Sequence, residues 1–250
     1  MNPALKYEEK LSRRGFFRIA AQTTLGFAGL SAVSFVCGVE EALTQIKGET
    51  MSVITLPKPM TKGKVSLEEA INKRRSERTF WNVHLTAEDL SQILWAAQGK
   101  TDPRGLRTAP SAGAQYPLDI YVVIGKVKES GEGLYHHDPQ RHSLRLLYEG
   151  DLRRPLAEAC LGQMFIADAP IVIVITAEYE KITDRYGERG VRYAHMEVGH
   201  VGQNIYLQAE ALGMGTVVTG AFRDRAVSKS LSLPEKHRPL YVMPVGYVTQ

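Results

Sequence analysis

The sequence predicts an α+β layered sandwich rather than a regular βαβ repeat. Helical and strand patterns follow one another in an uneven order, and long connections separate the main strands while one hairpin stands out. The chain has 250 residues. Without an N-terminal leader about 200 remain, which suits one domain with a sizeable core.

The leader begins with an adjacent arginine pair. Arg13 and Arg14 are followed by an uncharged stretch over residues 19–39, an arrangement that resembles a twin-arginine export signal. That route carries folded proteins, typically with a cofactor already loaded. A membrane anchor with basic flanks is the alternative, because a stretch of about 20 residues spans a bilayer if it is not cut. We therefore assign residues 1–45 to a twin-arginine signal or membrane anchor. The expected location is the periplasm or the outer face of the cytoplasmic membrane.

The segment after the leader is predicted to be a linker. Residues 46–64 are polar, contain Pro57 and Pro59, and show neither a helical nor a strand period. Residues 65–250 would then form the folded domain. Cys160 is the only cysteine of that domain and lies among aliphatic residues, so a buried structural thiol is expected and an internal disulfide is excluded. The net charge of +4 is modest, and nucleic-acid binding is not expected.

The first half of the domain is expected to place two short helices before a set of strands. Ser66 and Glu69 predict a capping box ahead of a helix through Lys73, and a second helix begins at Thr86 and ends before Gly99. Dense β-branched residues and a hairpin pattern predict the strands Leu118–Gly125, Gly133–Tyr135 and Ser143–Leu147.

The second half is expected to contain the longest helix. It runs roughly over Val191–Leu212, where apolar residues recur at core spacing before Gly213. Asp151 is predicted to cap a helix through Leu161, and Asp224 to cap a later one. The remaining strands are Pro170–Ala177, Gly215–Thr219 and Tyr241–Val245.

Three segments could carry chemistry. The run over residues 73–78 combines four cations with a serine at a helix end, which suits a phosphate group, although a basic helix end is usually a solvated face. The loop over residues 109–117 is rich in small residues, which lets its backbone approach a flat ligand, or it is an ordinary tight connection. Glycines bracket the third segment, residues 212–222, whose backbone amides could meet the edge of a ring.

The histidines of the long helix do not predict a metal site. His195 and His200 are five residues apart rather than four, which turns them away from a shared face. His200 is better interpreted as a packing or interface histidine. We expect no metal.

The three segments, in this order, resemble the nitroreductase-like flavoproteins. They read Arg-Arg-Ser-x-Arg, then Pro-Ser-Ala-Gly-Ala-x-Tyr-Pro, then a long helix ending in Leu-Gly-Met-Gly-Thr. The sequence is most similar to the thiazole/oxazole-forming (SagB/ThcOx-type) dehydrogenase branch, whose hairpin matches Gly133-Leu134-Tyr135 with Asp138-Pro139 and His142. The resemblance covers residues 66–247. It implies a homodimer with a central, mainly antiparallel sheet flanked by helices, and with flavin mononucleotide (FMN) at the subunit interface.

The resemblance also implies a set of cofactor-binding residues. Those that would hold the phosphate and ribityl chain are Arg74, Arg75, Ser76 and Arg78. Those that the partner subunit would place against the ring are Pro110, Ser111, Ala112 and Gly113. The Thr219 amide would approach flavin N5, and Gly220 would leave room for the ring. Two departures from the family pattern are Arg223, where an acidic residue is common, and the absence of a basic residue after Tyr247.

These features predict an FMN-dependent oxidoreductase that transfers hydride through flavin N5. The flavin carries the chemistry, so no catalytic acid or base is required, and Tyr116 is either a proton donor over the ring or a packing residue. Nicotinamide cofactors are cytoplasmic, so an exported enzyme would draw electrons from its substrate, a small molecule or a peptide, or from a membrane partner. The alternatives are an NAD(P)H-dependent nitroreductase facing the cytoplasm and a flavin-binding electron-transfer subunit without turnover.

Overall fold

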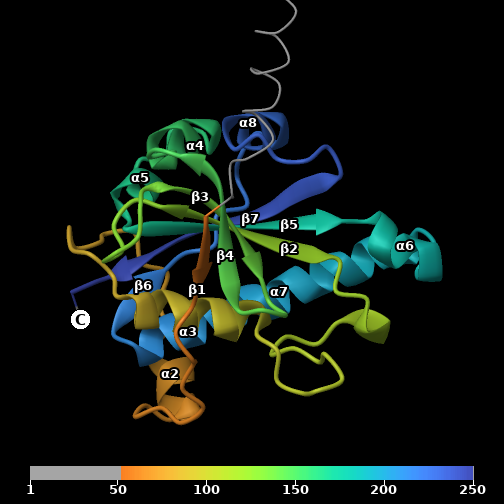
Figure 1. Cartoon of the computed structure of the whole chain (residues 1–250), viewed down its shortest axis with the longest axis horizontal. Helices are drawn as coiled ribbons and strands as arrows, with labels where there is room; N and C mark the ends of the chain where they lie inside the picture. Colours follow the sequence, from red (N-terminus) through yellow and green to blue (C-terminus); the bar gives the residue numbers. More distant parts are fainter. Residues whose placement is uncertain (1–51, 250) are drawn as a thin grey trace, which may run out of the picture. The chain divides into compact units, whose positions relative to one another are not determined.

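A single antiparallel sheet forms the centre of the domain (Figure 1). The computed structural model describes residues 52–249, and its seven strands follow the order β1-β4-β3-β2-β5-β7-β6, with every neighbouring pair antiparallel. The strands are β1 Val53–Thr55, β2 Leu118–Ile124, β3 Gly133–Asp138, β4 Ser143–Glu149, β5 Ile171–Glu178, β6 Met214–Thr216 and β7 His237–Tyr247. The predicted α+β class, with a central antiparallel sheet flanked by helices, is confirmed.

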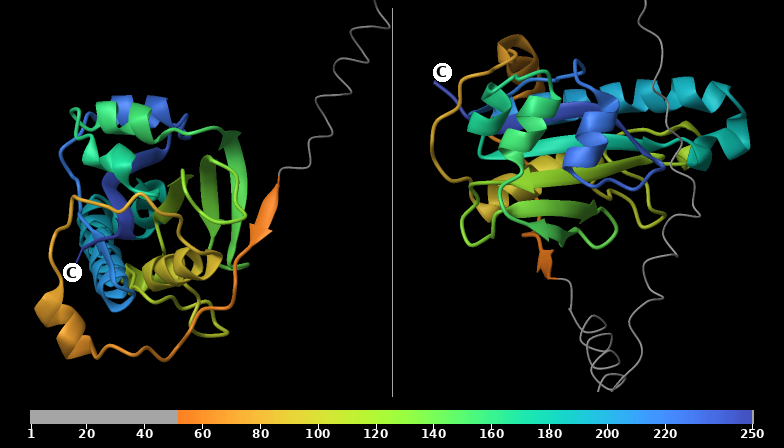
Figure 2. Two further views of the ribbon diagram at one scale, coloured as in Figure 1. Left: turned by 90° about the vertical axis from the view of Figure 1, so that its left-hand side faces the viewer. Right: turned by 90° about the horizontal axis from the view of Figure 1, so that it is seen from above.

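Helices cover both faces of this sheet (Figure 2). They are α2 Leu67–Lys73, α3 Ala87–Gln98, α4 Arg153–Ala159, α5 Phe165–Asp168, α6 Glu180–Tyr186, α7 Arg189–Ala211 and α8 Asp224–Ser230, with a 3-10 turn η1 at Ala112–Ala114. Within residues 52–249, no helix is long and apolar enough to cross a membrane. The proposed leader, residues 1–45, lies outside the described residues.

Alternation along the strands divides the core into two layers. The side chains of Ile120 and Val122 in β2 lie on one face of the sheet, and those of Tyr121 and Val123 lie on the other. The two pairs belong to different buried clusters. One cluster packs beneath α3 and α7, and the other packs beneath α4, α5 and α8. A slip of one residue would exchange the two layers, so burial on both faces fixes the register.

The long helix α7 provides the framework for the predicted site. Its buried residues Ala194, Val198, Val201, Ile205 and Ala209 recur every three or four positions and form one apolar stripe against the sheet. Side-chain amides attach α3 to this helix, because Asn204 donates to the Ala96 carbonyl and Gln92 donates to Gln208. The helix expected at Val191–Leu212 is therefore present with slightly earlier bounds.

The predicted linker 46–64 is wrong at residues 53–55, whereas residues 56–64 form neither helix nor strand, as expected. Val53–Thr55 form β1 at the edge of the sheet, paired with β4, and Leu56 beyond it is buried. The Met60 backbone N–H donates to Gln92 Oε1 at 2.8 Å, which ties the segment to α3. A strand of three residues has too short a pattern to be recognised before its partner strand is known.

The helix caps agree with expectation only in the first half of the chain. Ser66 Oγ accepts the Glu69 N–H, and Thr86 and Asp89 make a complete capping box. By contrast, Leu152 and Arg223 occupy the cap positions of α4 and α8, where Asp151 and Asp224 were predicted. Asp151 instead accepts both the backbone and the side-chain N–H groups of Arg153, so an ion pair replaces the cap.

Strand bounds and two short helices were also misjudged. The hairpin strand β3 continues through His136-His137-Asp138, which were expected to form the turn, and β7 begins before Tyr241. The strand expected at Gly215–Thr219 is shorter, ending at Thr216. Helices α5 and α6 were not predicted, because segments of four and seven residues carry little periodicity.

Candidate functional site

The predicted phosphate-binding residues are Arg74, Arg75, Ser76 and Arg78, which we call the arginine cluster; Arg74 is half-buried and the other three are exposed. It follows the C-terminal end of α2 and is attached to β6. Ser76 forms an isolated parallel β-bridge with Thr216, and the Glu77 N–H donates to the Thr216 carbonyl. Ser76 Oγ lies 3.0 Å from the Tyr206 hydroxyl on α7. The sheet and the long helix therefore both hold this cluster in place.

The arginines of the cluster are not neutralised by carboxylates. Arg74 lies over the Tyr206 ring, 5.1 Å from its centroid, and Arg78 lies 5.8 Å from the centroid of Phe165. Arg75 donates instead to the carbonyls that end α2. Within residues 52–249, no carboxylate forms an ion pair with any of the three. Unpaired guanidinium groups beside a serine hydroxyl are a donor set that fits a phosphate monoester.

The segment Thr219–Gly220 is connected to the arginine cluster through Tyr206. The Tyr206 hydroxyl, which contacts Ser76, also accepts the Val218 N–H at 2.9 Å. The backbone at Gly220 is exposed, and a side chain built there would meet no atom within 4 Å. An open strip of backbone therefore lies close to the unpaired arginines.

The expected role of the Thr219 amide needs correction. Its N–H donates to the Val242 carbonyl at 2.9 Å, and the Val242 N–H donates back, so the Thr219 amide is already committed to β7. The next amide, that of Gly220, has no hydrogen bond to any residue that the structure describes. The available donor in this segment is therefore the Gly220 N–H.

The small-residue loop, residues 109–117, lies at the opposite end of α7. Ser111 is close to Glu197, whereas the arginine cluster contacts Tyr206, nine positions later. At 1.5 Å per residue these positions are about 13.5 Å apart along the helix axis. Within one chain, the two groups of predicted flavin residues therefore lie at different points along α7.

The loop contains a position that only glycine fits. Gly113 has φ of 59°, and a Cβ added there would lie 2.4 Å from the Tyr186 hydroxyl. Tyr186 and Arg185 of α6 are thus close to the loop, although the sequence had not identified them as site residues. Their signal is weak, because α6 itself was not predicted and its contact with the loop depends on the tertiary fold.

Tyr116 packs against Arg107 and is hydrogen-bonded to residues of its own chain. Its ring lies 4.3 Å from the Arg107 guanidinium carbon, and its hydroxyl accepts the Arg107 N–H. Its own N–H donates to Ser111 Oγ at 2.9 Å, which closes the loop. These contacts favour the packing interpretation of Tyr116 over the proton-donor interpretation.

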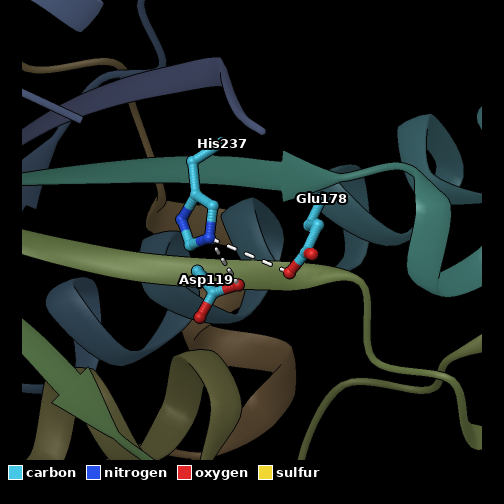
Figure 3. Close-up of side chains that lie close together, drawn as sticks. All are labelled: Asp119, Glu178 and His237. Atoms are coloured by element: carbon cyan, nitrogen blue, oxygen red, sulfur yellow. Dashed lines mark ion pairs between the residues drawn. The ribbon is translucent and has the colours of Figure 1, made fainter. Parts of the chain in front are cut away.

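A second cluster of charged groups lies on the neighbouring strands β2, β5 and β7 (Figure 3). The ligand atoms of Asp119, Glu178 and His237 lie within 4.8 Å of one another, a grouping that could hold a metal. However, Lys181 Nζ lies 3.0 Å from Asp119 and 2.9 Å from Glu178, so an ammonium group already pairs with both carboxylates. We assign this cluster a structural role.

The pKa of Asp119 reflects this compensation. Burial alone would raise that pKa, but hydrogen bonds from His136 and Lys181 outweigh burial and hold the pKa well below its usual value. The neighbouring Tyr121 hydroxyl lies 2.8 Å from His237 Nδ1, and burial raises the pKa of Tyr121. The shifts therefore favour the ionised carboxylate of Asp119 and the protonated hydroxyl of Tyr121.

Comparison with known proteins identifies relatives over most of the domain. The model of the nitroreductase family matches residues 71–247. A provisionally named nitroreductase of Methanocaldococcus jannaschii is 51% identical over 182 residues, covering 73% of this chain and 91% of the relative. The microcin B17-processing protein McbC of Escherichia coli is 29% identical, covering 66% of this chain and 63% of the relative.

A solved structure has the same fold. The crystal structure of a provisionally named nitroreductase from Ralstonia eutropha superimposes with a TM-score of 0.71 at 31% identity, covering 81% of this chain and 92% of the other. The microcin synthetase McbBCD complex of Escherichia coli matches at a TM-score of 0.61 and 24% identity, which shows likeness of fold alone.

Proposed function

This chain belongs to the nitroreductase family of oxidoreductases, and on that premise we propose that it is an FMN-dependent oxidoreductase of the SagB-type branch. Proteins of this family generally bind flavin. The observation that carries the choice of FMN is the arginine cluster, in which Arg75 and Arg78 are exposed, Arg74 is half-buried, and none has a carboxylate partner among the described residues. A phosphate monoester supplies the charge that such a donor set requires.

Different residues would contact different parts of FMN. Arg74 and Arg78 would bind phosphate oxygens, and Ser76 would donate to or accept from the same group. The Gly220 N–H would face the ring edge, in place of the Thr219 amide. Pro110, Ser111, Ala112 and Gly113 would come from a partner subunit, because in one chain they lie at the other end of α7.

When bound, the flavin supplies hydride transfer through N5. The chain's own residues then have positioning tasks. The arginines fix the phosphate end, the open backbone at Gly220 permits close approach of a flat ring, and an amide donor at its edge stabilises negative charge on the ring. Tyr116 remains a candidate proton donor only if the Arg107 contacts seen here are released.

We further propose that the protein is exported. Arg13, Arg14 and the uncharged stretch that follows support this, and residues 1–45 would be the signal and residues 65–250 the main flavin domain. Outside the membrane, electrons would come from the substrate or a membrane partner. The name of the Methanocaldococcus jannaschii relative favours a second candidate, a nitroreductase, and a relative from Methanothermobacter thermautotrophicus is named for NAD(P)H nitroreductase activity. The name of McbC, a microcin B17-processing protein, favours a processing enzyme instead.

Absorbance spectra test the function directly. We expect purified protein to be yellow, with one FMN per subunit, to bleach with dithionite and to respond poorly to NADPH. Rapid bleaching by NADPH would favour the nitroreductase candidate. A colourless protein that stays free of flavin when mixed with FMN would overturn the proposal, and a flavin that bleaches but never turns over would identify a carrier.

Two further measurements test assembly and export. Light scattering should give a homodimer, because the site requires residues from both chains, and a fully flavin-loaded monomer would contradict it. Replacing Arg13 and Arg14 by Lys keeps the charge but removes the guanidinium groups, so export should fail while an anchor would be unaffected. Fractionation of cells that express each version, followed by flavin fluorescence, measures the outcome.

A further inference from the structure

The sheet opens between β2 and β3. Their pairing ends at Tyr121 opposite His136, whereas β3 continues to pair with β4 as far as Asp138, and β2 pairs with β5 as far as Leu118. Residues 118–120 of β2 therefore have no partner on β3. A cavity of about 340 Å³ lies where the two strands part, lined from β2 by residues 118–120 and from the other side by residues 136–141. Its size is near the lower end for small-molecule sites.

Buried polar atoms without hydrogen-bond partners gather at this cavity. In the part of the chain that the structure describes, such side-chain atoms belong to four residues, Gln98, Arg107, His137 and Glu197. The first three line the cavity. Gln98 is 0% exposed and His137 is 1% exposed, yet the Gln98 amide nitrogen and both His137 ring nitrogens lack partners. Burying such groups without partners is costly, so their concentration at one cavity points to a polar ligand.

Glu197 does not supply the missing hydrogen-bond partners of Gln98 and Arg107. Its carboxylate approaches Gln98 and Ser111 without reaching hydrogen-bond geometry, and burial raises its pKa. It also does not line the cavity. Among the described residues, the Gln98 amide nitrogen and Arg107 Nε therefore still lack a hydrogen-bond acceptor.

The charge that remains uncompensated at the cavity is positive. Four cations line the cavity, Arg107, Arg141, Arg145 and Lys181, against two carboxylates, Asp119 and Asp138. Lys181 pairs with Asp119 and also with Glu178, and Arg141 pairs with Asp138. Neither Arg107 nor Arg145 forms an ion pair within residues 52–249. A small anion with two acceptor oxygens matches a guanidinium N–H beside an amide N–H.

We propose that this cavity binds a small organic carboxylate, with Arg107 Nε and Gln98 Nε2 donating to its oxygens and His137 contributing a third polar contact. The site is distinct from the arginine cluster, which lies at the other end of α7. Ligand binding would also stabilise the loop over residues 109–117, because Tyr116 stacks on Arg107 and donates to Ser111.

Benzoate is a suitable probe, with benzamide as a neutral control of similar shape. The experiment uses the full-length protein labelled with ¹⁵N-histidine, in which the His137 ring signals are assigned by the variant His137→Asn. We expect benzoate to shift the His137 signals along a saturable curve and benzamide to leave them in place. Arg107→Gln should weaken benzoate binding by about tenfold or more, as loss of a charge-assisted hydrogen bond predicts.

A matched control and a second variant keep the test decisive. Arg104→Gln removes an exposed arginine from the same loop, one already paired with Asp102, and should leave benzoate affinity unchanged. If Arg107→Gln does not fold, Gln98→Leu keeps the side-chain shape while removing the amide donor, and it should also weaken binding. Unshifted His137 signals, equal shifts with benzamide, or full affinity in these variants would overturn the proposal.

The flavin spectrum distinguishes this site from the proposed function. Benzoate that perturbs the flavin absorbance while the His137 signals stay fixed would be bound at the flavin, which overturns the cavity assignment. A protein that never binds FMN but shows the His137 shift would retain the carboxylate site and lose the proposed function.

Discussion

Arg153 and the arginine cluster show two opposite uses of the same side chain. Arg153 is 6% exposed, and its guanidinium donates to both oxygens of Asp151 and to the Ala169 carbonyl. Arg74 and Arg78 lie against aromatic rings and meet no carboxylate among the described residues. A buried arginine with its hydrogen bonds satisfied stabilises the fold, whereas arginines without a carboxylate partner are available to an anionic ligand.

Removing the unpaired arginines tests this contrast most strongly. Arg74→Ala combined with Arg78→Ala should weaken FMN binding by about 100-fold or more, because each charge-assisted contact contributes roughly 1.5–3 kcal/mol. The unfolding free energy of the flavin-free protein should change little, since both side chains are largely outside the core. Flavin fluorescence titration and urea unfolding measure the two quantities. Lys62→Ala with Lys64→Ala is the control for charge, and equal FMN loss in both variants would place the phosphate elsewhere.

Removing the paired arginine should give the reverse pattern. Arg153→Met should lower the unfolding free energy by about 3 kcal/mol, because Asp151 and the Ala169 carbonyl lose their donor. FMN affinity of the folded fraction should stay the same. Arg154→Met is the matched control, since its pair with Glu158 is exposed and contributes under about 1 kcal/mol. A loss of stability equal to that of the control would contradict the structural role.

The pH dependence of stability sharpens the same contrast. The hydrogen bond from Arg153 holds the pKa of Asp151 below its ordinary value. The stabilisation is therefore complete above the unfolded-state pKa, about 3.9, and is lost as the pH falls through the folded-state pKa. The difference in unfolding free energy between wild type and Arg153→Met should shrink below about pH 4. Urea unfolding across pH 3–7 measures it, and a difference independent of pH would exclude ionic pairing.

Arg75 lies between the two cases and should show the smallest effects. It is exposed, yet it donates to the carbonyls of Asn72, Lys73 and Arg74 at the end of α2. Arg75→Ala should cost about 0.5 kcal/mol of stability and reduce FMN affinity less than tenfold, because much of its donor capacity is already used. The same titrations measure both changes. An FMN loss as large as that of Arg74→Ala would show that Arg75 leaves the helix end to bind phosphate.

The sequence predicted elements where a pattern was long or a motif local. The periodic stripe of α7, the β-branched run of β5 and the Thr86 start of α3 all appear as expected, because each depends on residues near one another in the chain. It failed at β1 and α6, which are both short, and β1 is held by β4, far along the chain. The cap at Asp151 failed because its carboxylate pairs with Arg153, and Asp224 is the first residue of α8 rather than its cap.

For the candidate site, the sequence indicated which residue types could bind a ligand, but it did not indicate which groups surround them. The composition of residues 73–78 indicated phosphate chemistry from the sequence alone. That Arg74 and Arg78 lack carboxylate partners, that the Thr219 amide is already bonded to Val242, and that Tyr116 stacks on Arg107 are facts of packing. Each depends on elements more than twenty residues away or on the path of a loop, which local patterns do not encode.

The sequence by itself determined the fold class, the long central helix and the family, because periodicity and ordered motifs are properties of the chain. Tertiary structure alone decided which arginines are paired, where the two halves of the site lie along α7, and that β2 and β3 part to form a cavity. The physical reason is that hydrogen-bond satisfaction and burial depend on distance in space, and segments far apart in sequence supply the partners.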